Sequence, residues 1–146
     1  MKKLLILVFC SMVAVSSAYS GDLELETIGA LGGANLYLSY MAIGAVADGY
    51  TKKVYDKKTA KGMIAEVVSI SNVSKDYLKK LIDQGVLTGN DVDFANTMIE
   101  TYDYLIAEGT AFSKYVDNPQ KNFSDDFHSN RNLAWGKISQ LLGLNK

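Results

Sequence analysis

Apolar residues recur at spacings of three and four along most of the chain, as they do in helices that pack one face against other helices. Four segments carry this pattern, roughly residues 23–54, 58–84, 90–117 and 125–142. Proline occurs once, and nothing in the pattern resembles a strand-rich protein. The sequence therefore predicts an all-α protein.

Each segment has a stripe of residues that we expect to face the core. The first stripe is Ile28, Leu31, Asn35, Leu38, Ala42, Ala45 and Gly49. The second is Met63, Val67, Ile70, Ser74, Tyr77 and Leu81. The third is Ala95, Met98, Tyr102, Leu105, Gly109, Phe112 and Val116. The fourth is Phe127, Ala134, Ile138 and Leu141, widened by Trp135 and Leu142.

The breaks between segments carry residues that end and start helices. Gly85 and Gly89 suit the end of the second helix, and Asn90 is a candidate N-cap of the third. Pro119 stops the third helix, and Ser124 is expected to start the fourth.

The first break lies between Asp48 and Lys61 and is the weakest, because only Gly49 and Gly62 mark it. Connections this short place consecutive helices antiparallel. We therefore expect one domain, residues 19–146, folded as an antiparallel up-down-up-down four-helix bundle after a cleaved signal peptide.

Residues 1–18 have the form of an export signal. Two lysines precede an apolar run from Leu4 to Val15, and Ser16 and Ala18 occupy the positions that a signal peptidase reads before Tyr19. The run is about twelve residues long, whereas a membrane-spanning helix needs about 20. We expect a bacterial protein that is exported, and is periplasmic or secreted.

Composition excludes several classes of protein. The chain is 48% hydrophobic and 21% charged, which argues against a disordered protein. The one cysteine, Cys10, leaves with the signal, so the mature chain has no disulfide and no thiolate metal site. Loss of two lysines takes the formal net charge from −1 to −3, which disfavours nucleic acid as a partner.

No recognised catalytic or cofactor motif stands out. A di-metal bundle site needs two Glu-x-x-His motifs, and the chain has one histidine. Met63 and His128 form the one pair that bundle geometry allows as axial haem ligands, but a solvent-facing His128 is the simpler interpretation. We expect no catalytic residues, no metal and no cofactor; an enzyme of unknown class stays as an alternative.

Residues 27–47 are uncharged throughout and are bounded by Glu26 and Asp48. Their length, and the Gly29-xxx-Gly33 spacing, would also suit a transmembrane helix. Polar residues within the segment and its acidic flanks favour instead a buried helix of a soluble bundle.

A lysine cluster follows this segment. It consists of Lys52, Lys53, Lys57, Lys58 and Lys61. These side chains could contact anionic lipid head groups or another acidic envelope component. The alternative is a solvated end of a helical hairpin, because cations are favourable near a helix C-terminus.

Polar side chains also interrupt the predicted core stripes. Tyr77 and Tyr102 would need hydrogen-bond partners if buried, and Asn35 and Ser74 are candidates for that role. Such pairs would set the helix register, and the alternative is a small ligand pocket between helices.

The sequence favours an exported, non-catalytic helical bundle that binds an envelope protein or a small ligand. The alternative is a membrane-associated or membrane-inserting protein that uses residues 27–47 and the lysine cluster.

Overall fold

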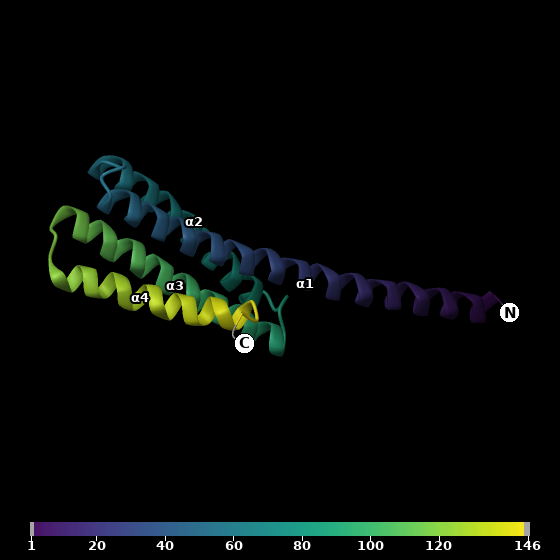
Figure 1. Cartoon of the computed structure of the whole chain (residues 1–146). Helices are drawn as coiled ribbons and strands as arrows, with labels where there is room; N and C mark the ends of the chain where they lie inside the picture. The colour runs from purple at the N-terminus through teal and green to yellow at the C-terminus, as the bar shows by residue number, and fades with distance from the viewer. Residues whose placement is uncertain (1, 145–146) are drawn as a thin grey trace. The chain divides into compact units, whose positions relative to one another are not determined.

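The computed structural model describes the backbone of residues 2–144, and the side chains of residue 23 and residues 25–144. Every regular element in this range is a helix: α1 (Lys2–Thr51), α2 (Lys57–Asp83), α3 (Asn90–Asp117) and α4 (Lys121–Leu141) (Figure 1). The predicted all-α class is therefore confirmed for the described residues. The predicted signal, residues 1–18, lies outside the residues whose side chains are described.

The chain divides into two compact units, Met1–Gly32 and Gly33–Lys146. The second unit holds the C-terminal part of α1 and all of α2, α3 and α4. The packing described below belongs to this second unit, which forms a helical bundle.

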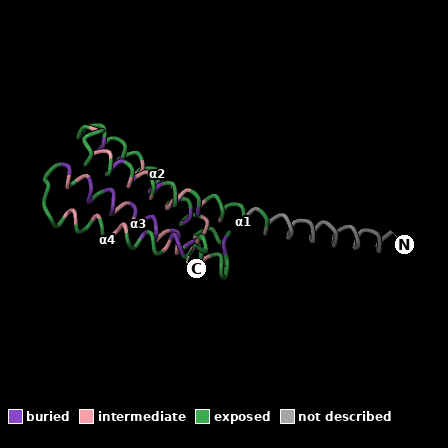
Figure 2. Tube along the Cα trace, in the orientation of Figure 1, coloured by how far each residue is buried: buried purple, intermediate pink, exposed green. Residues whose placement is uncertain are grey.

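Helix α3 is the most buried element of this unit. All seven residues of its predicted stripe are buried, from Ala95 to Val116. Figure 2 shows buried positions recurring along α3. It packs against both α2 and α4, so residues on more than one side of α3 lose contact with water.

The core stripes predicted for α1 and α2 are wrong, because the buried residues lie about one position further along each helix. In the part of α1 that belongs to this unit, Leu38 and Ala45 are exposed, whereas Leu36 and Ile43 are fully buried. In α2, Met63, Ile70 and Tyr77 are exposed, and the buried residues are Ala60, Ile64, Ser71 and Leu78.

The physical reason is that apolar residues occur on adjacent sides of both helices, so periodicity alone does not select the face. In α2 the packing partner selects the face, because Gly109 of α3 allows Ile64 and Val68 to approach closely. A Cβ atom at Gly109 of α3 would lie 2.7 Å from Cγ2 of Val68 and 3.1 Å from Cγ2 of Ile64.

In α4 the predicted face is largely correct. Ala134 and Ile138 are buried, and Phe127 and Leu141 are half-buried. Trp135 keeps 40% of its surface exposed. Its ring lies 5.4 Å from the Tyr40 ring of α1, centroid to centroid, so it covers the edge of the α1–α4 interface.

The observed helix ends correct three further predictions. Gly49 and Gly62 lie inside α1 and α2 rather than in the break between them. The N-cap of α3 is Gly89, and Asn90 is the first helical residue. Helix α4 begins at Lys121, before Ser124, and its first turn carries an exposed Lys121–Asp125 ion pair at 2.7 Å.

Candidate functional site

The lysine cluster lies around the turn between α1 and α2, and two of its five members are held by an ion pair with another helix. Lys57 and Lys61 both contact Asp117 at the end of α3, at 3.0 and 2.6 Å. Hydrogen bonds from Lys61 and Lys57 hold the pKa of the Asp117 carboxyl below its usual value. These two lysines therefore connect α2 to α3.

The other three lysines are less constrained. Lys52 lies 3.9 Å from Asp48 on the surface, a pair that contributes little to stability. Lys53 and Lys58 make no ion pair among the described residues. The structure thus separates Lys53 and Lys58 from the structural members of the cluster.

Lys53 has an unusual backbone. Its φ of 60° is the one positive φ of a non-glycine residue in the described range. Its amide donates to the Tyr50 carbonyl at 2.9 Å, and the Val54 amide donates to the Gly49 carbonyl at 2.8 Å. This pair of bonds is the Schellman motif that ends many helices, with Lys53 at the left-handed position.

The same motif ends α2 and α4 with glycine at that position. Gly85 has φ 68° and Gly143 has φ 63°, each with the corresponding pair of backbone hydrogen bonds. Glycine adopts this conformation without steric strain, whereas a side chain there costs about 1 kcal/mol or more. Lys53 alone among the three bears that strain.

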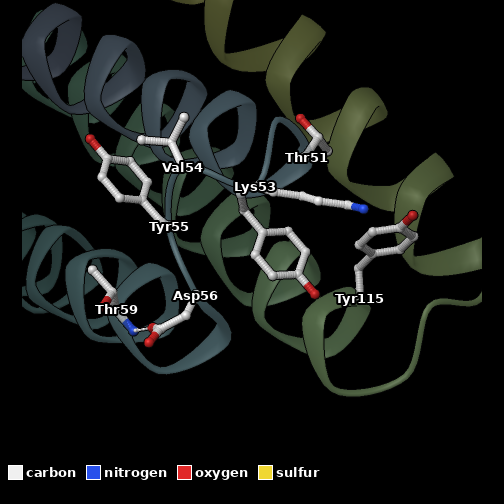
Figure 3. Close-up of a pocket in the computed structure, with 8 residues that line it drawn as sticks. Thr51, Lys53, Val54, Tyr55, Asp56, Thr59 and Tyr115 are labelled. Carbon is white, nitrogen blue, oxygen red and sulfur yellow. Dashed lines mark hydrogen bonds between the residues drawn. The ribbon is translucent and has the colours of Figure 1, made fainter.

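Lys53 also lines an open groove of about 800 Å³ at this end of the bundle. The residues that line it are Tyr50, Thr51, Lys53, Val54, Tyr55, Asp56, Thr59 and Tyr115. Figure 3 shows the Lys53 side chain extending in the direction of the Tyr115 ring. The groove thus combines one ammonium group with three tyrosine side chains and the Asp56 carboxylate. The Tyr55 hydroxyl points away from the Lys53 ammonium group (Figure 3).

Two local features hold the groove in shape. Gly49 leaves room for the Tyr55 ring, which a Cβ atom at that position would overlap. Asp56 caps α2, and its carboxylate accepts a 2.7 Å hydrogen bond from the Thr59 amide (Figure 3). This bond lowers the pKa of Asp56, so the carboxylate is ionised and committed to the helix start.

An ammonium group and phenol hydroxyls together can bind an anionic group, because each donates a hydrogen bond to it. The sequence pointed to the lysine cluster but not to the tyrosines beside it. Tyr50 and Tyr115 are 65 positions apart in the chain, and only the fold brings them together.

The four predicted polar core residues differ in burial and in hydrogen bonding. The Tyr102 hydroxyl is buried and donates to Asn35 Oδ1 at 2.8 Å, so the predicted Asn35–Tyr102 pair is present. Burial raises the pKa of Tyr102, and Ser74 acts against that rise. Tyr77 is 63% exposed, so its assignment to the core is wrong. None of the four residues lines the groove.

A buried ion pair was not predicted. Glu108 of α3 is fully buried, and its Oε1 accepts a 2.8 Å hydrogen bond from Arg131 of α4. The Arg131 guanidinium lies 3.9 Å from the Tyr40 ring centroid and donates to the Tyr40 carbonyl at 3.1 Å. A Cβ atom at Gly44 would overlap this guanidinium, which therefore needs the glycine.

Two signals in the sequence could have revealed this pair. Arg131 is the single arginine in a chain with 14 lysines, and Glu108 falls beside Leu105 and Gly109 on the buried face of α3. Desolvation raises the pKa of Glu108 to about 7, against the opposing effect of Arg131. The pair joins α1, α3 and α4, which gives it a structural role.

The haem ligand pair considered from sequence has little support. Met63 and His128 are both exposed. Among the residues that the structure describes, no group of three or more His, Cys, Asp or Glu side chains is placed to hold a metal ion.

Among the residues described, one helical stretch, Leu25–Thr51, is long and apolar enough to cross a membrane by length and composition. A third of its most apolar window is buried in the structure. Leu31 and Leu38 are 67% and 64% exposed.

Comparison with protein-family models, with curated proteins and with solved structures finds no match to this chain.

Proposed function

We propose that this chain is an exported, non-catalytic helical-bundle protein of the bacterial cell envelope that binds an anionic partner in the Lys53 groove. The proposal of export depends on residues 1–18, whose lysines, apolar run and small residues before Tyr19 match a cleaved signal. The partner is a small anionic ligand or an acidic side chain of another envelope protein.

We further propose that residues 33–144 form an antiparallel up-down-up-down bundle. Pairs between α3 and α4 support this order: Phe112 contacts Phe127, Glu108 contacts Arg131, and Glu100 contacts Lys137. Residue numbers fall along one helix as they rise along the other. This order brings the end of α1, the start of α2 and the end of α3 together at the groove.

The backbone strain at Lys53 is the observation that carries the binding proposal. Glycine would serve the Schellman motif better, as it does at Gly85 and Gly143. Strained residues are concentrated at functional sites, where the contribution of the side chain to function outweighs the loss of stability that the strain causes. Here the strained residue places its ammonium group in a groove with Tyr50, Tyr55 and Tyr115.

The Lys53→Gly variant tests this proposal because it separates stability from binding. It is expected to be about 1 kcal/mol more stable than the wild type, since glycine adopts the left-handed conformation freely. We expect an anionic component to co-purify with the wild-type protein from envelope extracts and to be lost from the variant. The variant should also bind inorganic phosphate more weakly in an NMR titration.

Lys58→Gln is the matched control. It also removes one lysine charge from the cluster, but Lys58 is exposed and does not line the groove. It should retain the component that Lys53→Gly loses. Equal retention by the wild type and both variants would contradict the proposed site.

A second candidate function is association with a membrane. The exposed apolar residues of α1 favour it, above all Leu31 and Leu38, together with the length and composition of Leu25–Thr51. The lysine cluster follows directly in the sequence and would add attraction to anionic lipid.

A further inference from the structure

A second cavity lies beside the groove and is much smaller, about 140 Å³. It is formed by the last residues of α1, the end of α3 and the first turns of α4. The lining residues are Ala47, Asp48, Thr51, Phe112, Tyr115, Ser124, Phe127 and His128. Thr51 and Tyr115 also line the groove, but Lys53 does not line the cavity.

The walls of the cavity are aromatic and apolar. The Phe112 and Phe127 rings are 6.0 Å apart, centroid to centroid, and inclined by 51°. Ala47, which is nearly fully buried, contributes a small side chain from α1. An apolar cavity of about 150 Å³ holds one benzene ring, so this cavity has the size for a single six-membered ring.

Five polar side chains line the cavity. Tyr115, Ser124 and His128 can both donate and accept hydrogen bonds, whereas Asp48 and Thr51 of α1 act as acceptors. The Thr51 hydroxyl proton is already used, because Oγ1 donates to the carbonyls of Ala47 and Asp48 at 3.1 and 3.0 Å. Its oxygen lone pairs are left to accept. The Asp48 carboxylate can only accept hydrogen bonds. Its negative charge is only weakly balanced by the Lys52 ammonium group, which lies 3.9 Å away.

We propose that this cavity binds a small molecule with one aromatic ring and one hydrogen-bond donor, of the phenol class. The ring lies against Phe112 and Phe127, and the hydroxyl donates to Asp48 or Thr51. The aromatic walls supply the apolar contact. At Asp48 and Thr51 a hydroxyl gains a hydrogen bond that an ether cannot make, and the Asp48 carboxylate repels an anion. This site uses residues other than Lys53 and does not depend on the groove binding a partner.

Two probes of nearly the same shape test the proposal on the unmodified protein. Phenol and anisole share the ring and its oxygen, but anisole has a methyl group in place of the donated proton. In ligand-observed NMR titrations we expect phenol to bind with a dissociation constant of about 1 mM. Anisole and benzoate should each bind at least about tenfold more weakly. Equal binding of phenol and anisole would overturn the proposal.

A pair of variants locates the binding site. Ala47→Leu fills the cavity from α1 and should abolish phenol binding. Ala45→Leu makes the same change at an exposed position two residues earlier and should leave binding unchanged. Phenol binding that persists in a folded Ala47→Leu protein would overturn the assignment to this cavity. Lys53→Gly should not alter phenol binding, so failure of the groove proposal and failure of this one are distinguishable.

Discussion

Glu108 places a carboxyl group where water does not reach it. One of its oxygens is paired with Arg131, and the other, Oε2, has no hydrogen-bond partner within the described part of the chain. A half-paired buried carboxylate is unfavourable, because the lost hydration is only partly replaced. This explains why burial raises the pKa of Glu108 to about 7 despite the neighbouring guanidinium.

The raised pKa predicts how stability depends on pH. Between 4.5 and about 7 the folded protein holds a proton on Glu108 that the unfolded chain has released, so stability falls as pH rises through this window. The full difference corresponds to about 3 kcal/mol. We expect the free energy of unfolding of the wild type, relative to Glu108→Gln, to fall by up to that amount, as measured by urea denaturation from pH 4.5 to 7.5.

The glutamine variant is a suitable reference because its amide oxygen can still accept the hydrogen bond from Arg131. Asp56, Glu100 and Asp117 have lowered pKa values, so the stability that they contribute is lost at acid pH. This loss is the same in both proteins and cancels in the comparison. Parallel stability curves for the wild type and Glu108→Gln would show that Glu108 does not titrate in this window.

At the scale of the helices, close packing between α2 and α3 depends on Gly109. Alanine is the better helix former by about 0.8–1 kcal/mol, but a methyl group here would press on Val68, whose branched side chain has little freedom to move. We expect Gly109→Ala to lower the free energy of unfolding by about 1–2 kcal/mol, measured by chemical denaturation.

Gly136 and Gly62 provide the matched comparison for that prediction. Both lie in helices, and a Cβ atom at either would meet nothing within 4 Å. Gly136→Ala and Gly62→Ala should each stabilise the protein by about 0.8–1 kcal/mol. The same sign for Gly109→Ala and Gly136→Ala would contradict the close approach of α2 to α3.

At the scale of the whole molecule, one fractionation experiment separates the two candidate functions. We expect the protein expressed in bacteria to begin at Tyr19 by mass spectrometry. It should also stay in the supernatant after carbonate extraction of membranes, because the buried side of α1 belongs to the bundle. Recovery in the pellet would favour the membrane candidate, and an intact N-terminus would contradict export.

The candidate site was only partly accessible from the sequence. The five lysines were recognised as a cluster, but their spacing does not show that Lys57 and Lys61 are held by Asp117, 56 or more positions away. The strain at Lys53 was also hidden, because a lysine is not expected at a left-handed helix end. Tyr50 and Tyr115 of the groove, and Phe112 and Phe127 of the cavity, come from three different helices, so no local sequence pattern shows that they meet.

The amino-acid sequence by itself determined the helical class, the approximate extents of α2 and α3, and the buried face of α3. Local periodicity and helix-ending residues carry that information, and both act over a few positions. Only the tertiary structure decided which side of α1 and α2 is buried, since each has apolar residues on adjacent sides and the packing partner selects between them. It likewise decided the Glu108–Arg131 pair, the groove and the cavity, because these join residues that are distant in the chain.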